Sequence, residues 1–123
     1  MKAKILSIKD KGGANNCFEE IAFNIDGKRY KLLIGFVYRP ASEVEAKINP
    51  YILQNHAKYD INKHTEGYAI PFIALISQNN LLFYEECDNY RSLIAKLINT
   101  YPHLSEVVKR SLYYTYALQK VIE

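Results

Sequence analysis

The segment from residue 18 to residue 38 constrains the fold most, because two alternating apolar runs flank an Asp26-Gly27 pair. Both positions of a two-residue hairpin turn need positive φ, which Asp and Gly tolerate, so the pair predicts a β-hairpin. With this turn, Ile25 lies opposite Lys28, and the apolar faces of the two strands coincide, which fixes the register. The paired apolar residues expected on that face are Ile21, Phe23 and Ile25 with Tyr30, Leu32, Ile34, Phe36 and Tyr38.

Three further strands are predicted, over residues 2–9, 69–77 and 81–86, with loops at residues 11–16 and 78–80. The strand over 69–77 has apolar residues on both faces. Such a strand is either central and covered on both sides, or covered on one side and part of an interface on the other. Pro71 is placed near its start, where a missing amide donor is tolerated.

Helical patterns occupy the middle and the end of the chain. Ser42 begins a capping-box pattern, and a second short helix is predicted from Asn49 to about Tyr59, followed by an irregular stretch over 60–67. Apolar residues at three- and four-residue steps predict a helix over 90–101, capped by Asp88. Pro102 ends it, and a last helix is expected from about Leu104 to about Val121.

These elements predict an α+β fold in one domain over residues 1–123. We expect an antiparallel sheet of four to five strands, made of two hairpins and the N-terminal strand, packed against the two C-terminal amphipathic helices. The expected core residues are Ile21, Phe23, Leu32, Ile34, Phe36, Phe72, Ile76, Leu93, Leu97, Val108 and Leu118.

Composition narrows the class of protein. The chain is 49% apolar and 24% charged, and its net charge is only +3, a globular balance. Residues 1–39 carry 8 basic and 4 acidic side chains, so the positive excess lies near the N-terminus. No apolar run approaches the roughly 20 residues that span a membrane. We expect a cytoplasmic protein, in the host cytoplasm if its AT-rich-type composition reflects a viral source, with thiols at Cys17 and Cys87 that could also pair if it is exported.

Tyrosine gives the clearest functional signal, at 11 of 123 residues with no tryptophan. Three tyrosines gather on the last helix beside basic residues, and Tyr113 is expected to point to solvent. Tyrosine combines an apolar body with a polar tip and is enriched in interfaces. The leading hypothesis is a non-enzymatic binding protein that self-associates as a homodimer or binds a protein partner. Tyr114 and Tyr116 could instead widen the helix core. The expected partner-binding residues are Tyr113, Tyr114, Tyr116, Lys109 and Lys120.

The tip of the first hairpin supports an alternative. Lys28, Arg29 and Lys31 surround Tyr30, and a basic β-ribbon can contact the phosphates of nucleic acid. The same residues could simply be solvated lysines and arginines that protect a sheet edge. The alternative hypothesis is therefore a nucleic-acid-binding protein that uses Lys28, Arg29 and Lys31.

An enzyme with an unrecognised site is the third hypothesis, centred on residues 56–66. His56, Asp60 and His64 would share a face, and could hold a transition metal, only if one helix ran through them. The acidic pairs Glu19-Glu20 and Glu85-Glu86 lie on strands, so their members point to opposite faces. No phosphate-binding, zinc-protease or serine-hydrolase motif occurs. We therefore expect no catalytic residues, no metal and no cofactor.

Overall fold

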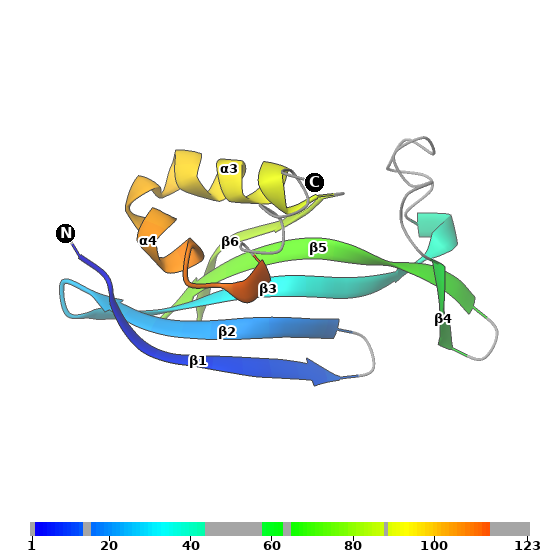
Figure 1. Cartoon of the computed structure of the whole chain (residues 1–123), viewed down its shortest axis with the longest axis horizontal. Coiled ribbons are helices and arrows are strands. Elements are labelled where there is room, and N and C mark those ends of the chain that lie inside the picture. The colour runs from blue at the N-terminus through cyan, green and yellow to red at the C-terminus, as the bar shows by residue number, and fades with distance from the viewer. Residues whose placement is uncertain (1, 14–15, 44–57, 63–64, 88, 114–123) are drawn as a thin grey trace.

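The computed structural model describes residues 2–13, 16–43, 58–62, 65–87 and 89–113. A twisted antiparallel sheet forms one layer and the C-terminal helices form a second (Figure 1). The fold is therefore α+β, as predicted. The elements are β1 (Lys4–Gly13), β2 (Asn16–Ile25), β3 (Lys28–Pro40), β4 (Lys58–Asn62), β5 (Thr65–Ser77), β6 (Asn80–Glu86), α3 (Tyr90–Thr100), the 3-10 helix η1 (Pro102–Leu104) and α4 (Ser105–Val108).

The first hairpin forms with the predicted register. Ile25 pairs with Lys28, Phe23 with Tyr30 and Ile21 with Leu32. Asp26 and Gly27 both adopt positive φ, at 52° and 80°. β1 then adds to β2 in antiparallel fashion. It continues to Gly13, so part of the loop expected at residues 11–16 is strand, because residues 11–13 extend the ladder with β2.

β5 lies at the centre of the sheet, whose strand order is β1-β2-β3-β5-β4 with β6 also paired to β5. Its pairing with β3 runs from Tyr30 opposite Ser77 to Pro40 opposite Gly67. On the other edge, β4 pairs with residues 65–68 and β6 with residues 72–77. Within the described residues the sheet thus has six strands, one more than the upper number predicted.

Pro71 lies in the middle of β5 rather than near its start. Its carbonyl oxygen accepts a hydrogen bond from the amide of Cys87 on the β6 side. The nitrogen and the carbonyl of one strand residue face the same edge, so the missing N–H also faces away from β3. Pro71 therefore removes no hydrogen bond from the long β3–β5 ladder, and it falls between the segments that pair with β4 and with β6.

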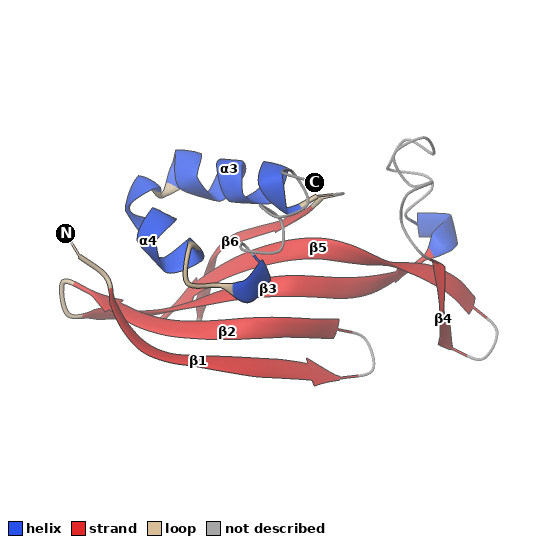
Figure 2. Cartoon of the chain, viewed as in Figure 1, coloured by secondary structure: helices blue, strands red, loops and turns tan. Residues whose placement is uncertain are grey.

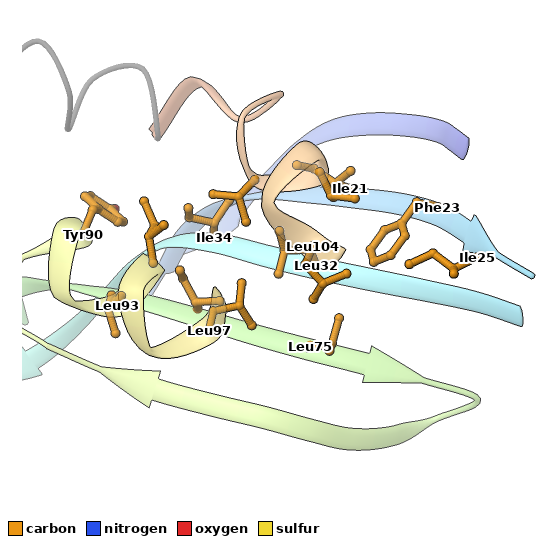
Figure 3. Close-up of a cluster of buried hydrophobic side chains, with 14 residues drawn as sticks. Ile21, Phe23, Ile25, Leu32, Ile34, Leu75, Tyr90, Leu93, Leu97 and Leu104 are labelled. Atoms are coloured by element: carbon orange, nitrogen blue, oxygen red, sulfur yellow. The ribbon is translucent and has the colours of Figure 1, made fainter. Parts of the chain in front are cut away.

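The main core lies between the helices and one face of the sheet (Figure 3). α3 presents the predicted stripe, with Tyr90, Leu93, Ile94 and Leu97 buried. Two predicted core residues, Phe72 and Ile76, lie instead on the opposite face, because Ile73 and Leu75 are the β5 residues that oppose Ile34 and Leu32. Phe36 packs at the margin of the core, and Leu118 lies outside the described residues. The predicted core residues that are fully buried beneath the helices are Ile21, Phe23, Leu32, Ile34, Leu93, Leu97 and Val108.

The cap of α3 differs from the prediction by one residue. The side chain of Asn89 accepts a hydrogen bond of 2.8 Å from the amide of Ser92. Asn and Asp are equivalent caps, so the sequence pattern alone does not separate Asn89 from its neighbour. Asp88 lies outside the described residues.

The last helix is not continuous, contrary to the prediction. α4 ends at Val108, and tight backbone bonds follow, from Arg110 to Val107 and from Ser111 to Val108. The Ser111 hydroxyl then accepts a bond of 3.1 Å from the amide of Tyr113, as an N-cap does. Ser111 lies within the single helix predicted from about Leu104 to about Val121, and its capping role changes the direction in which Leu112 and Tyr113 point.

The middle of the chain also departs from the sequence pattern. Helical backbone begins at Ala41 and continues to Glu43, close to the capping box predicted at Ser42. The remainder of that helix, and most of the one predicted over 49–59, lies outside the described residues. Residues 58–62 form β4 rather than a helix end or an irregular loop, because strand pairing with β5 overrides weak local preference.

Gly35 gives a test of this packing. A Cβ at this position would overlap the carbonyl oxygen of Cys17 and lie 2.5 Å from Cα of Phe18. We predict that Gly35→Ala lowers the free energy of unfolding by about 3 kcal/mol in urea denaturation, the upper end of overpacking costs. Gly27→Ala is the control. It meets no atom within 4 Å and adds only the roughly 1–2 kcal/mol of a positive φ. Equal losses in both variants would contradict the close approach at Gly35.

Candidate functional site

The helices α3, η1 and α4 all lie on one side of the sheet (Figure 2). On the other side, the described helical backbone is limited to residues 41–43, where Ala41 packs against Tyr68 and Ile70 at one end of the sheet. We call this second side the open face. Strand residues alternate between faces, so the neighbours of the buried core residues lie on the open face. Ring contacts and ion pairs between side chains of neighbouring strands agree with that assignment.

Aromatic rings cross the middle of the open face. Phe18 of β2 meets Phe72 of β5 edge to face, with 5.9 Å between ring centroids. Gly35 of β3 separates them in the ladder, so the two rings close over a position without a side chain. Tyr84 of β6 stacks on Phe72 at 6.1 Å. Phe72 is buried beneath its neighbours, whereas Tyr84 is 42% exposed.

A buttressed charge pair adjoins Tyr84. Arg39 donates two hydrogen bonds to the Glu86 carboxylate, at 3.0 and 2.7 Å. The Tyr84 hydroxyl donates a third bond of 2.7 Å to Glu86 Oε2. The bonds to Glu86 raise the pKa of Arg39. Partial burial and the bond to Glu86 raise the pKa of Tyr84, so its phenol stays protonated and holds this donor role at neutral pH.

A second ion-pair group lies nearer the tip of the first hairpin. Glu20 contacts the amines of Lys11 at 3.1 Å and Lys31 at 3.6 Å. Burial alone would raise the pKa of Glu20, but the hydrogen bond from Lys11 and the charges of both lysines outweigh it, and the pKa is lowered. Glu20 therefore stays ionised and partly neutralises two cations.

Positive charge dominates the open face. Among the side chains that the structure describes there, six are basic and two are acidic, and both acidic groups already contact cations. The basic excess noted in residues 1–39 thus concentrates on one surface, because alternate positions of β1 and β3 point the same way. The basic residues are Lys4, Lys9, Lys11, Arg29, Lys31 and Arg39.

A groove of about 550 Å³ opens where the two hairpin tips meet. The Ser77 hydroxyl donates to the carbonyl of Arg29 at 3.1 Å, which ties the end of β5 to the first hairpin. Gln78 and Asn79 follow with positive φ, at 51° and 64°, and present amide side chains beside the cations. The residues that line the groove are Glu20, Arg29, Tyr30, Lys31, Ile76, Gln78 and Asn79.

The predicted nucleic-acid residues are divided by this geometry. Arg29 and Lys31 both line the groove, and each lies on the open face. Lys28 is exposed on the turn but opposes Ile25, so it faces the helical side. The structure therefore brings two of the three cations together.

Tyr113 does not point to solvent, which corrects the prediction. It packs against the core and meets Phe36 at 5.7 Å and Tyr90 at 5.6 Å between ring centroids. Its hydroxyl lies 3.6 Å from the Cys17 sulfur. Burial, and then the contact with Cys17, raise the pKa of Tyr113. The break after α4 turns this ring inward, because Leu112 and Tyr113 do not continue the helix of α4 as the sequence pattern predicts.

Among the other residues of the predicted tyrosine surface, the structure describes Lys109. It is exposed and contacts Glu106 at 3.7 Å. Tyr114, Tyr116 and Lys120 lie outside the described residues, so their place on a binding surface stays a prediction.

The sequence pattern did not predict a buried carboxylate near the break at Ser111. Glu19 is only 2% exposed, and it accepts hydrogen bonds from the Ser111 hydroxyl at 2.7 Å and the Leu112 amide at 3.0 Å. It thus supplies an acceptor to the first turn after the break and joins β2 to the C-terminal segment. Nothing in the local sequence distinguishes Glu19 from Glu20, since the bond spans 92 residues.

The aromatic residues of the open face were also missed. Phe18, Phe72 and Tyr84 each lie in a segment that was predicted to be a strand. Phe72, however, was assigned to the core, and the other two were not assigned to a site. Only the order of the strands, with β5 beside β3, shows that these rings meet.

No group of three or more His, Cys, Asp or Glu side chains that could hold a metal occurs in the part of the chain that the structure describes. His56 and His64 lie outside that part of the chain. Cys17 is exposed and Cys87 half-buried, and they do not form a disulfide with each other. No helix among the described residues is long and apolar enough to cross a membrane.

Comparison of the chain with protein-family models, with curated proteins and with solved structures gives no match. The geometry and the electrostatics of the open face are therefore the available guide to function.

The inward position of Tyr113 predicts a contrast between neighbouring residues. Tyr113→Ala should lower the free energy of unfolding by about 2 kcal/mol, because it removes a partly buried ring. Tyr113→Phe keeps the ring and should cost less than about 1 kcal/mol. Leu112→Ala, at a residue that is 67% exposed, should change it by less than about 0.5 kcal/mol. Chemical denaturation measures all three, and a Tyr113→Ala loss no larger than that of Leu112→Ala would contradict the packing.

Proposed function

We propose that this chain is a non-enzymatic binding protein whose open face binds nucleic acid. The observation that carries the proposal is the segregation of cations, six basic side chains against two paired acidic ones, on a face beside exposed aromatic surface. Nucleic-acid affinity arises chiefly from such clustered contacts to phosphates. The net charge of the whole chain, at +3, understates the local field.

The exposed chemistry of the open face favours a polar ligand over a large apolar partner. Ile70 is 2% exposed, Phe72 6% and Ala74 3%, so the strand's second apolar face is already covered by neighbouring side chains. Long basic side chains and the Tyr84 ring remain for contact, together with Leu81, which opposes Ile76 at the outer strand and is 61% exposed. An obligate protein interface would instead expose a broad apolar centre and deplete lysine.

The ion pairs of the open face are also suited to exchange. Lys11 and Lys31 are each 47% exposed while they contact Glu20. Exposed pairs of this kind contribute little to stability, with a median of about 0–1 kcal/mol. A phosphate can therefore take over a lysine from Glu20 at small cost to the fold.

Fluorescence anisotropy with labelled nucleic acid at several salt concentrations tests the proposal. The wild-type chain should bind, and the logarithm of affinity should fall linearly with the logarithm of salt concentration. The double substitution Arg29→Ala, Lys31→Ala should weaken binding. It should also reduce the magnitude of the salt slope by about 1 for each phosphate that the variant no longer neutralises.

The matched control removes two cations from the helical side, as Arg91→Ala, Arg110→Ala, with the same change in net charge. It should leave affinity close to that of the wild type. Glu20→Gln should tighten binding, because it releases two lysines from their carboxylate. Equal weakening by both double variants would show that overall charge, and not the open face, governs binding.

Self-association is a second candidate, favoured by the outer strand β6. Leu81 is 61% exposed and Leu82 is 42% exposed, and β6 pairs with β5 along one edge only among the described strands. An exposed apolar edge strand is a site for pairing with another chain. This candidate keeps the expectation of a homodimer and moves it from the tyrosine surface to β6.

Light scattering during gel filtration tests self-association. If β6 mediates it, the mass should rise toward twice 14.3 kDa with concentration, and Leu81→Lys should return it to the monomer value because a buried charge opposes pairing. Leu112→Lys, at another exposed leucine away from the sheet edge, should leave the mass unchanged. A constant monomer mass at high concentration would remove this candidate.

A further inference from the structure

Tyr84 is the exposed aromatic side chain on the open face that is best prepared to receive a ligand. We propose that the open face binds single-stranded nucleic acid, with unpaired bases stacked on Tyr84 and Phe18 and phosphates held by Arg29 and Lys31 in the groove. The inference rests on the proposed function and names its ligand class.

The ring of Tyr84 is fixed before any ligand arrives. Phe72 supports it at 6.1 Å between centroids with an interplanar angle of 30°. Its hydroxyl is held by Glu86 at 2.7 Å, and Glu86 is held in turn by Arg39. A side chain ordered in this way loses little conformational freedom on binding, which is the physical basis of preorganisation.

The shape of the surface favours unpaired bases. Duplex DNA is read by an element that enters a groove, such as a helix or a protruding ribbon. Tyr84, Phe72 and Phe18 instead lie along the pleated surface of the sheet, where they cannot reach bases that are stacked inside a duplex. Aromatic rings in a basic groove are the common means of holding single strands without sequence preference.

Cations and rings lie along one path on the sheet. Lys31 opposes Ile76 in the β3–β5 ladder, and Ala74, the next β5 residue on that face, pairs with Tyr84. The groove contains Lys31 and Ile76, so along β5 it lies two residues from the position that pairs with Tyr84. From Arg29 to Gly35, beneath Phe18, the β3 strand advances about 20 Å at about 3.4 Å per residue. A short run of nucleotides can span this path.

Anisotropy titrations with four labelled ligands test the inference at one fixed salt concentration. They are an unstructured DNA strand, an RNA strand of the same sequence, and the duplex of each, with lengths between about 4 and 16 nucleotides. The single strands should bind more tightly than the duplexes. The DNA and RNA arms show which source of the shared chemistry the protein prefers.

Three variants assign the stacking role. Tyr84→Ala should weaken single-strand binding by about 5- to 150-fold, the loss expected for one stacked base, and leave duplex binding nearly unchanged. Tyr84→Phe keeps the ring and should retain most of the affinity. Leu82→Ala removes an equally exposed side chain from the same strand and should have no effect, which separates stacking from the apolar character of β6.

The outcomes separate this inference from the proposed function. Duplex affinity equal to or above single-strand affinity, or an unchanged affinity in Tyr84→Ala, overturns the single-strand inference and leaves nucleic-acid binding intact. No binding of any ligand at low salt overturns both. Because Tyr84 is part of the packing over Phe72, thermal unfolding of each variant confirms that the folded protein is being compared.

Discussion

The long antiparallel pairing of β3 with β5 is the contact on which the rest of the structure depends. It joins the first hairpin to the second half of the sheet over residues that are far apart in the sequence. It also aligns Leu32 with Leu75 and Ile34 with Ile73, which creates the floor on which α3 and α4 pack. The same register sets Gly35 opposite Phe72 and so determines the arrangement of rings on the open face. A shift by one residue would exchange the two faces.

The two faces of the sheet differ in how their side chains are shielded from water. Beneath the helices, apolar side chains are removed from water, and the hydroxyl of Tyr90 is satisfied by the Gly35 carbonyl at 2.7 Å. On the open face, aromatic rings pack on one another and Ala41 packs against Tyr68 and Ile70, while Lys11 and Lys31 remain in contact with solvent. Glu19 marks the boundary between these regimes: it is buried, yet accepts two hydrogen bonds from the C-terminal segment. Removing a buried carboxylate such as that of Glu19 would leave the donors of the C-terminal segment without this acceptor. Glu19 therefore fixes where that segment meets β2.

Local patterns predicted much of the fold because they have local causes. The Asp26-Gly27 turn and the stripe of α3 are each specified by residues within a few positions of one another. The sequence did not reveal which face of β5 meets the helices, since both faces are apolar and the choice depends on pairing with β3. The break at Ser111 was missed for a related reason, because Glu19, its partner in the structure, is distant in sequence. For the candidate site, the cations Arg29 and Lys31 were predicted. The aromatic row, formed by Phe18, Phe72 and Tyr84, can be recognised only once the order of the strands is known.

The aromatic row shows how stability and binding constrain each other on an open sheet face. Phe18 and Tyr84 both pack beside Phe72, so these two rings help to bury Phe72 whether or not a ligand is present. A ring that served binding alone would be free to reorient and would lose that freedom on contact. Tyr84 has already lost much of it through Phe72 and Glu86. Folding therefore meets the ordering cost in advance, and the proposed single-stranded ligand would bind this face more tightly than a flexible surface of the same composition.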